Sequence, residues 1–356
     1  MGPWHRIIAV REKTALTDSD EANLFELDNN SEAPPRSFAP GEMITCEACL
    51  RSNPPTRATC IYCAAKLAST EDKGLTAQPP VQADTGDAYH VVLAPDQNAD
   101  MTQSTLAGIS SLTRLKISDL ENIIRIGQPF PIACVATSEQ AAVLADKLHE
   151  LGTDGITVAN DSLNPGVPTR KIRALEFSDE SVAAIALSDS RKISARWEDV
   201  VLLVSGRLVV NRVEVEERRR RGRSQPLGAR ELFSDESVVD LYTSQDEGNW
   251  RIAANSFDFS CLGESKAVTT FENFAALINL LRQRASNAQF DNSYMQLKPA
   301  LSTVWPLEPQ TRKGEWRRSG AGKLDMSTVT TTENEAQFTQ YSRLRYCLRL
   351  RGLEGR

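Results

Sequence analysis

Apolar and polar residues follow two different periods between residues 89 and 165. The pattern predicts a strand at 90–94, a short helix at 118–127, and then a strand, a helix and a strand over 129–161. Within the second helix Leu144, Leu148 and Leu151 recur at i, i+4 and i+7, so they share one face. Strands and helices that alternate in this way favour a small α/β domain over 89–165.

Between residues 166 and 290 the pattern changes to strands, followed by one amphipathic helix at 269–286. The apolar, β-branched stretches are KIRALEF, SVAAIAL, KISARW, DVVLLVSGRLVVNRVEV, SVVDLYTS and WRIAANSFDF. The apolar face of the helix consists of Phe271, Phe274, Ile278 and Leu281. This order predicts a small barrel or bent sheet that is closed by the helix, with Trp197 and Trp250 as core anchors.

Both long helices carry residues that favour helix ends. Thr137 and Gln140, like Thr269 and Glu272, have the spacing of a capping box, in which a hydroxyl and an acidic or amide side chain satisfy the first free N–H groups. Gly152 stands where a helix C-terminus favours a left-handed residue. We therefore expect helices that begin after Thr137 and Thr269.

The string FSDESV occurs twice, at 177–182 and at 233–238, each time beside strand-like sequence. Serine and aspartate suit turns, so the two copies predict two equivalent turn-to-strand corners. Coincidence is the alternative, because repeat architectures usually show several copies.

The C-terminal extension, 291–356, ends in YSRLRYCLRLRG. Apolar residues alternate there with arginines, which is the period of a strand. The extension also fits a helix, since four apolar residues lie about one turn apart: Phe338, Tyr341, Leu344 and Leu348. Both alternatives remain open at the level of sequence.

Two polar stretches hold too little apolar surface to offset the entropy of ordering. They predict a flexible N-terminus over 1–40 and a linker over 68–88. The segment between them, 41–67, is then expected to be a small module set apart from the rest of the chain. The longest apolar run, 200–210, is interrupted by Gly206 and Arg207, so no transmembrane segment is predicted.

Composition is that of an ordinary globular protein, with 40% hydrophobic and 25% charged residues. The formal net charge is −6, which argues against a basic domain that grips nucleic acid along its whole surface. The N-terminus lacks the small-residue cleavage site of a secretory signal, so we expect a cytoplasmic protein. We assign the fold to the α+β class, with several domains.

Four of the seven cysteines form two Cys-x-x-Cys pairs that are ten residues apart in the sequence. The paired cysteines are Cys46, Cys49, Cys60 and Cys63. Two such pairs supply four thiolates for a tetrahedral Zn²⁺ and leave no open position for water. The spacing therefore predicts a structural zinc ribbon over 41–67, and a segment this short would depend on the metal to fold.

The frame Cys-x2-Cys-x3-Asn-x6-Cys-x2-Cys, with Asn53 at its Asn position, resembles the RanBP2-type zinc finger. This resemblance covers about twenty residues and implies binding of single-stranded RNA, ubiquitin or other proteins. The sequence departs from that family at Ile44, where a Trp is expected. A bacterial-style zinc ribbon that makes protein contacts fits equally well, and the chain as a whole resembles bacterial zinc-ribbon proteins.

A dense basic cluster follows one predicted strand and precedes another, which predicts an exposed loop. Its members are Arg218, Arg219, Arg220, Arg221 and Arg223. Guanidinium groups contact phosphates in pairs of hydrogen bonds, so this loop is a candidate site for nucleic acid or anionic lipid. Neighbouring glutamates supply the alternative interpretation, a solvated loop that neutralises itself in part.

Candidates for catalysis are poor. The GAGK string at 320–323 lacks the frame of a phosphate-binding loop, and His5, His90 and His149 share no spacing. Cys134 lies in an apolar strand and is expected to be a buried small hydrophobe.

The β-rich region with its last helix resembles the pleckstrin-homology (PH) fold, which implies a reader of phosphoinositides or peptides. We therefore expect a non-enzymatic adaptor or regulatory scaffold that binds a protein partner through the zinc ribbon and the PH-like domain. One alternative is a nucleic-acid-binding protein that uses the ribbon and the arginine-rich segments. The other is an enzyme whose site is assembled from residues far apart in the sequence.

Overall fold

In a computed structural model of the chain, the structure describes residues 36–38, 43–46, 51–57, 59–62, 65, 67, 88–94, 101–163, 167–189, 191–220, 223–245, 250–320 and 323–352. These residues belong to one compact unit, 34–356. The predicted flexible N-terminus, 1–40, lies outside the described residues except for 36–38, which form a strand and so correct the prediction there. The predicted linker, 68–88, also lies outside them except for Ala88, which is buried. No helix in the described ranges is long and apolar enough to cross a membrane.

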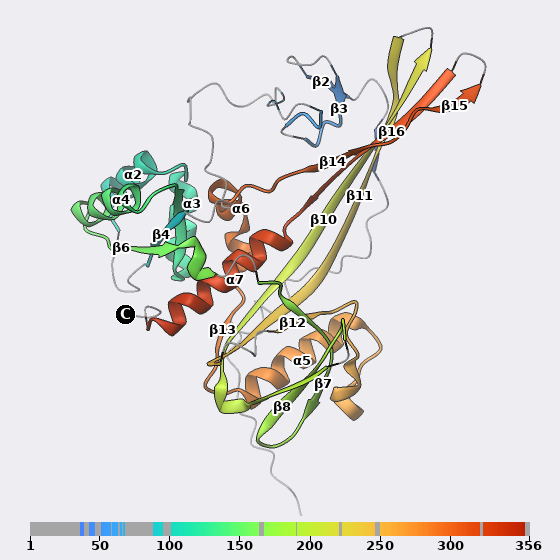
Figure 1. The fold of residues 1–356 in the computed structure, drawn as a ribbon. Helices are drawn as coiled ribbons and strands as arrows, with labels where there is room; N and C mark the ends of the chain where they lie inside the picture. The colour runs from blue at the N-terminus through green and yellow to red at the C-terminus, as the bar shows by residue number, and fades with distance from the viewer. Residues whose placement is uncertain are drawn as a thin grey trace, which may run out of the picture. The chain divides into compact units, whose positions relative to one another are not determined.

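The segment from 88 to 163 folds as a three-stranded sheet with helices (Figure 1); the predicted strands and the two predicted helices are present, and the helix at 103–112 is an element that the pattern did not predict. The elements are β4 (Tyr89–Leu93), α2 (Gln103–Leu112), α3 (Ile117–Ile126), β5 (Phe130–Val135), α4 (Ser138–Glu150), β6 (Gly155–Ala159) and the 3-10 turn η2 (Asn160–Leu163). The sheet order is β5-β4-β6, and both pairs are antiparallel. Leu148 is completely buried, while Leu144 and Leu151 pack against the same core, so the predicted apolar face of α4 is confirmed.

The predicted helix ends are present. Thr137 accepts a hydrogen bond from the backbone N–H of Gln140 at 3.3 Å, and the side chain of Gln140 accepts one from the N–H of Ala136 at 3.1 Å. Gly152 has a φ of +78°, the left-handed conformation that its position predicted. Thr269 and Glu272 form the full reciprocal capping box of α5 (Thr270–Arg284).

The largest sheet contains most of the remaining strands. They are β1 (Arg36–Phe38), β7 (Arg170–Phe177), β8 (Ser181–Ala186), β9 (Lys192–Arg196), β10 (Val200–Arg220), β11 (Arg223–Thr243), β12 (Trp250–Ala253), β13 (Gln289–Asp291), β14 (Gln310–Lys313), β15 (Arg317–Gly320) and β16 (Lys323–Glu333). Their order is β14-β16-β10-β11-β12-β7-β8-β9, with β1 on β11, β13 on β10 and β15 on β16.

The two longest strands, β10 and β11, form a hairpin that belongs to two regions. Nearer its base, β10 pairs with the parallel strand β13 and β11 pairs with β12. Farther out, from Val210 onward, β10 pairs with β16. We call the outer region the arm; it comprises β1, β14, β15 and β16 with residues 210–220 and 223–234 (Figure 1).

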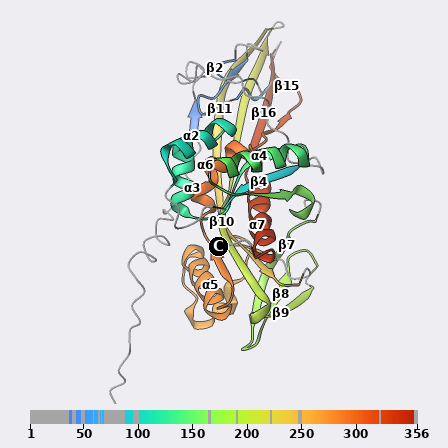
Figure 2. The ribbon, with the colours of Figure 1, turned by 90° about the vertical axis from the view of Figure 1, so that its left-hand side faces the viewer.

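The region at the base is a curled half-barrel sheet, which together with helix α5 we call the curled half. Strand β9 leads directly into β10 through the 3-10 turn η3 (Trp197–Asp199), although four strands separate the two in the sheet order β10-β11-β12-β7-β8-β9. Helix α5 packs into the same core as Ile172 of β7 and Val182 of β8, and Figures 1 and 2 show it at the same end of β10 as these strands. Trp197 and Trp250 are buried in this core, as expected.

The apolar face of α5 is confirmed except at its start. Phe274, Ile278 and Leu281 are buried in the core of the curled sheet. Phe271, in the first turn of the helix, is 38% exposed, so its place on the core face was predicted wrongly. The α+β fold class is confirmed by the presence of both helices and curled sheet.

The other face of the hairpin belongs to a second core, which also contains α6 (Tyr294–Val304) and α7 (Glu335–Leu350). Leu202 and Val204 of β10 join residues of the β5-β4-β6 sheet in this core. Helix α7 decides between the two predictions for the C-terminal extension. Its buried positions include Phe338, Tyr341, Leu344 and Leu348, so the helical alternative is correct.

The two FSDESV copies occupy different structures. The copy at 177–182 forms the tight turn between β7 and β8, where Ser178 bonds to Ser181 through its hydroxyl group. The copy at 233–238 runs through the middle of β11 without a turn. The prediction of two equivalent corners is therefore wrong, because pairing with β10 along its whole length keeps the second copy extended.

Candidate functional site

The cysteine module, residues 43–67, contains two tight turns that place its described cysteines. The N–H of Cys46 donates to the carbonyl of Arg51 at 2.8 Å, and the N–H of Cys60 donates to the carbonyl of Ala65 at 2.7 Å. The N–H of Tyr62 donates to Sγ of Cys60 at 3.4 Å. A hydrogen bond to sulfur favours the thiolate, which is the form that binds metal.

Cys46 and Cys60, the first cysteines of the two pairs, are both buried and belong to one small cluster with Leu67. Their residue type, burial and N–H contact fit the donor set of a thiolate metal site. Cys49 and Cys63 lie outside the described residues. Within the described part of the chain, no three His, Cys, Asp or Glu side chains gather as a metal site requires.

Asn53 holds the two turns of the module together. It is fully buried in β3 (Ser52–Asn53), which pairs with β2 (Ile44–Thr45). Its Nδ2 donates to the carbonyl of Arg51 at 2.9 Å, and its Oδ1 accepts from the N–H of Ile61 at 2.9 Å. The same side chain therefore fixes the turn after Cys46 and the turn after Cys60.

The module contacts the arm, whereas the sequence predicted a module set apart between flexible stretches. Ile61 packs against Val213, Val215 and Ala229 in a small apolar cluster, with Phe38, Met43 and Tyr62 beside it. The three arm residues are on one face of the sheet, because side chains alternate and Val215 pairs with Ala229. Apolar burial thus joins module and arm.

Polar contacts surround this apolar cluster. The Tyr62 hydroxyl donates to Oε1 of Glu217 at 2.7 Å, and Thr311 donates to the carbonyl of Ile61 at 3.1 Å. Arg57 donates to the hydroxyl of Thr332 at 3.1 Å. Burial, together with the hydrogen bond to Glu217, raises the pKa of Tyr62 well above its usual value, so the phenol remains a donor.

The predicted arginine loop is largely strand, which corrects the sequence interpretation. Arg218, Arg219 and Arg220 are the last residues of β10, and Arg223 is the first residue of β11. Arg221 lies outside the described residues. The run is kept extended because β16 continues alongside it, with Arg218 opposite Asp325 and Arg220 opposite Lys323.

Arg218 is engaged within the arm. Its Nε and Nη2 donate to the two carboxylate oxygens of Asp325 at 2.7 and 2.8 Å. The hydrogen bonds from Arg218 lower the pKa of Asp325 to about 2, although burial opposes the shift slightly. Arg219, the next residue on β10, is exposed. The five predicted arginines therefore do not form one equivalent set.

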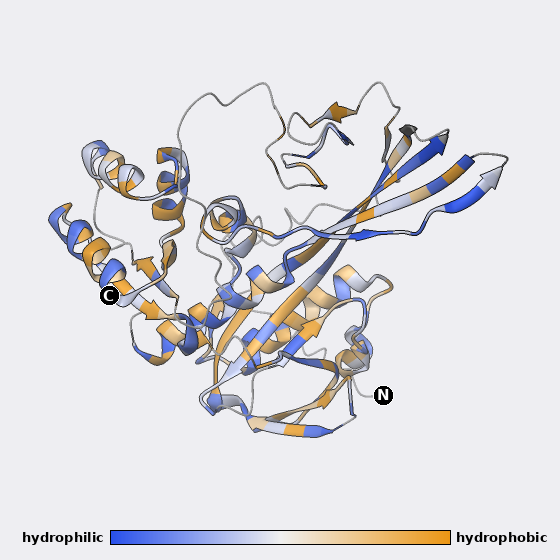
Figure 3. Cartoon of the chain, turned by 45° about the horizontal axis from the view of Figure 1, so that its top comes forward, coloured by the Kyte–Doolittle hydropathy of each residue, from blue (hydrophilic) through white to orange (hydrophobic). Residues whose placement is uncertain are grey.

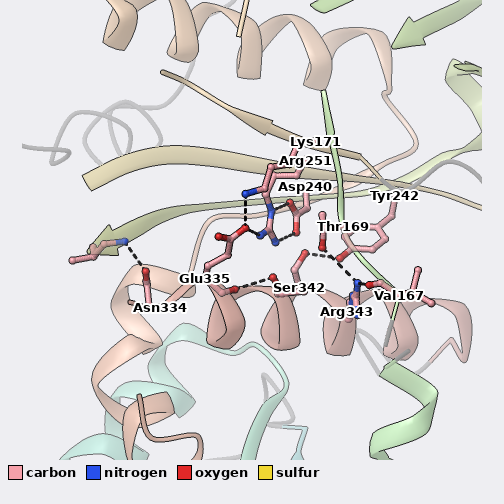
Figure 4. A network of polar contacts seen from close by, with 12 residues as sticks. Val167, Thr169, Lys171, Asp240, Tyr242, Arg251, Asn334, Glu335, Ser342 and Arg343 are labelled. Atoms are coloured by element: carbon pink, nitrogen blue, oxygen red, sulfur yellow. Dashed lines mark hydrogen bonds and ion pairs between the residues drawn. The ribbon is translucent and has the colours of Figure 1, made fainter. Parts of the chain in front are cut away.

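A buried polar network ties α7 to the curled sheet (Figure 4). Arg251 of β12 donates from Nε and Nη2 to both carboxylate oxygens of Asp240 at 2.7 and 2.8 Å. Its Nη1 lies 3.4 Å from Glu335, the first residue of α7, which also pairs with Lys171 at 2.9 Å. Burial works against the charge of Arg251, but Asp240 outweighs it and raises the pKa.

The same helix is fixed farther along. Ser342 and the Tyr242 hydroxyl lie 2.8 Å apart and share a hydrogen bond (Figure 4). Arg343 donates to the backbone carbonyls of Val167 and Leu163, and its burial lowers its pKa. These contacts connect α7 to β11, through Tyr242, and to the segment that precedes β7, through Leu163 and Val167.

A second buried network surrounds Asp291 of β13. Arg345 lies 2.8 Å from Oδ2 of Asp291, the Tyr341 hydroxyl donates to the same oxygen at 2.7 Å, and Ser293 donates to Oδ1 at 2.6 Å. Burial raises the pKa of Tyr341 far above its usual value, and the charge on Asp291 adds to the effect. The Arg345 side chain also reaches Gln128, before β5, at 2.6 Å.

His90 is buried at the junction between β4 and α7. Its Nε2 lies 3.1 Å from Oδ1 of Asn160, and the indole N–H of Trp305 donates to its Nδ1 at 3.3 Å. Burial lowers the pKa of His90, which favours the neutral ring. His149, in contrast, is exposed beside Asp154, and His5 lies outside the described residues.

These networks consist of groups that neutralise one another inside the fold. Charged groups such as Asp240 and Asp291 are held by arginines, and burial raises the pKa of the Cys134 thiol to about 11, which makes it a poor nucleophile. The arrangement is suited to hold α7 in place. The sequence signal that could have found it is a charged residue inside an apolar strand, such as Asp240 in SVVDLY and Arg251 in WRIAA.

No protein-family model matches the chain, and no solved structure matches it.

Proposed function

We propose that this protein is a non-enzymatic adaptor or scaffold in which Zn²⁺ closes the cysteine module and the module, with the arm beneath it, forms the contact surface for a protein partner. Cys46, Cys49, Cys60 and Cys63 would be the ligands. The reducing cytoplasm is the proposed compartment, because it keeps the thiols available to metal.

One observation carries the proposal. The module is held on the arm by Ile61 in its apolar cluster and by Tyr62 on Glu217. A metal that orders the turn at Cys60 therefore also orders the residues that contact the arm. The zinc would be structural, because four thiolates leave no open coordination position for substrate.

The finer assignment of the curled half as PH-like is also a proposal. It is supported by the bent sheet and by α5, which covers its core. The sheet also contains a parallel pair of strands, β12 with β7, and the assignment to the PH fold has to account for this pair. A fold alone does not confer lipid or peptide binding.

Metal content tests the first half of the proposal. We expect purified protein to hold one zinc per chain, and Cys46→Ser to hold almost none, with Cys261→Ser as the matched control because Cys261 lies in the curled half, away from the module. Hydrogen exchange of peptides covering 211–217 should rise in Cys46→Ser and remain unchanged in the control. Wild-type protein without zinc, or unchanged exchange on the arm, would contradict the proposal.

Partner capture tests the second half. Native lysate is passed over wild-type protein, a Cys46→Ser/Cys49→Ser variant and the Cys261→Ser control, and bound proteins are identified by mass spectrometry. The adaptor proposal expects defined partners that only the double variant loses. The same partners on all three proteins would move the contact surface away from the module.

A further inference from the structure

Two basic segments that are far apart in the sequence meet at the outer end of the arm. Arg317 and Arg318 of β15 pair with Asp325 and Leu324 of β16, and those same β16 residues pair with Arg218 and Arg219 of β10. Only the first segment forms a dense basic cluster in the sequence. The strand register thus places a second arginine pair in line with it across β16.

The basic end, as we name it, is the set of described Lys and Arg side chains on this part of the arm. Its members are Arg218, Arg219, Arg312, Lys313, Arg317, Arg318 and Lys323. Five of the seven are exposed, namely Arg219, Arg312, Lys313, Arg317 and Arg318. Figure 3 shows the outer ends of these strands mostly in blue, with a short orange stretch, whereas β10 and β11 nearer the helices are largely orange.

The charge of the basic end is opposite to that of the chain. By sequence, the two segments that form it, 214–223 and 312–325, hold ten Lys and Arg against five acidic residues, which gives a net charge of +5. The acidic residues are Glu214, Glu216, Glu217, Glu315 and Asp325. Because the whole chain carries −6, the remaining residues carry −11. A polyanion is therefore attracted to the end of the arm and repelled by the rest of the molecule.

The basic side chains are on both faces of the ribbon. Residues that pair across strands share a face, so Arg218 and Arg317 are on one side and Arg219 and Arg318 on the other. A flat anionic surface such as a membrane would meet one face only. A groove with phosphates along both walls meets both.

The dimensions and composition also favour a groove. One β-layer with its side chains is roughly 10 Å thick, and the major groove of B-form DNA is about 12 Å wide. The residues of the basic end are mostly arginine, which binds phosphate in pairs of hydrogen bonds. The strand ends carry charge where insertion into a bilayer would need a large apolar surface.

We propose that the basic end of the arm binds duplex DNA, without regard to sequence, by entering the major groove and contacting phosphates on both walls. This function is separate from the adaptor function and does not depend on zinc. It predicts steep weakening of binding with salt, because each neutralised phosphate releases counterions.

The test uses full-length protein and a fluorescent 24-base-pair duplex, followed by anisotropy across a salt series. The arm variant is Arg219→Gln/Arg317→Gln/Arg318→Gln, which leaves the Arg218–Asp325 pair intact. The matched control, Arg114→Gln/Lys147→Gln/Arg191→Gln, removes the same charge from exposed positions outside the arm. Thermal unfolding verifies that both variants are folded.

We expect wild-type protein to bind the duplex at 50 mM NaCl, with a log–log salt slope of about −0.9 for each phosphate contacted. The arm variant should lose at least tenfold in affinity, and its slope should flatten by about 2.7 if each removed arginine contacts one phosphate. The control should stay within twofold of wild type.

Three outcomes would overturn the proposal. The first is no duplex binding by wild-type protein at 50 mM NaCl, and the second is an equal loss in the arm variant and the control. The third is a preference for vesicles of 30% phosphatidylserine or for single-stranded DNA of the same length, which would assign the basic end to a membrane or to unpaired strands. None of these outcomes depends on zinc content, so the adaptor proposal is judged separately.

Discussion

Single residues decide how the buried charges of this protein are tolerated. Arg251 and Asp240 face each other across β12 and β11 as a register pair, and both are buried. Two hydrogen bonds satisfy the carboxylate, and Glu335 adds a third oxygen near the guanidinium. Such a pair contributes little net stability but is costly to break, because the group left behind remains charged in a medium of low polarity.

Removal of one partner is therefore expected to destabilise the fold strongly. Asp240→Asn should lower the free energy of unfolding by about 3–5 kcal/mol in a urea titration, since Arg251 keeps its charge. The control is Asp179→Asn, whose carboxylate is fully exposed beside Arg284 and which should change stability by less than about 1 kcal/mol.

Replacement of both partners by apolar residues tests whether the loss in Asp240→Asn comes from the unpaired charge of Arg251. Asp240→Leu/Arg251→Met removes both charges, and we expect it to recover most of the loss. If Asp240→Asn were no worse than Asp179→Asn, the pair would not be buried as described.

At the scale of elements, β10 changes its neighbour part-way along. It pairs with β13 up to Val204 and with β16 from Val210. In the gap, Asn334 takes the place of a strand residue: its Oδ1 accepts from the N–H of Val209 at 2.6 Å and its Nδ2 donates to the carbonyl of Arg207 at 3.0 Å. Because α7 begins at the next residue, the same side chain fixes the start of that helix.

The close approach of α7 to β10 requires a glycine. A Cβ on Gly206 would lie 2.5 Å from the ring of Phe338. We expect Gly206→Ala to lower the free energy of unfolding by about 1–3 kcal/mol, because the packed ring must move. Thermal or urea unfolding measures the loss.

A second glycine provides the control. Gly228 lies on β11, in the same hairpin as Gly206. A Cβ on Gly228 would meet only the carbonyl oxygen of Phe38 at 3.6 Å, which is an ordinary van der Waals distance. Gly228→Ala should leave stability within about 0.5 kcal/mol of wild type or raise it slightly. Equal effects at the two glycines would show that α7 does not approach β10 through Gly206.

At the scale of the whole molecule, β10 and β11 contribute to two cores at once. Leu203 and Val239 belong to the core of the curled half, while Leu202 and Val238 belong to the core with α6 and α7. Strands that are buried on both faces have continuous apolar sequence, as in VVLLV. The curled half therefore shares its central strands with the rest of the described fold.

A fragment cut at the boundaries that the sequence predicts for the PH-like domain, 166–290, is expected not to fold alone. It lacks α6, α7 and β16, so Leu202 and Val204 would lose their cover and the outer part of β10 would lose a neighbour. Circular dichroism during heating should show no cooperative transition for the fragment, in contrast to 34–356. A fragment that unfolds cooperatively would establish the curled half as an independent domain.

The sequence by itself determined the local elements. Period and caps predicted α4 and α5, Gly152 marked a helix end, and the strands of the curled half followed from β-branched runs. These features depend on interactions within a few residues, which a pattern records. The spacing of the four cysteines likewise supports its chemical interpretation without any fold.

The tertiary structure alone decided what depends on contacts between distant residues. The second FSDESV copy became strand and the arginine run became the end of β10, because long partners lie beside them. The C-terminal extension is a helix because its apolar stripe has a core to cover. Burial and strand register also join Ile61 to Val213 and align Arg219 with Arg318 across Leu324, and these relations have no local signature in the chain.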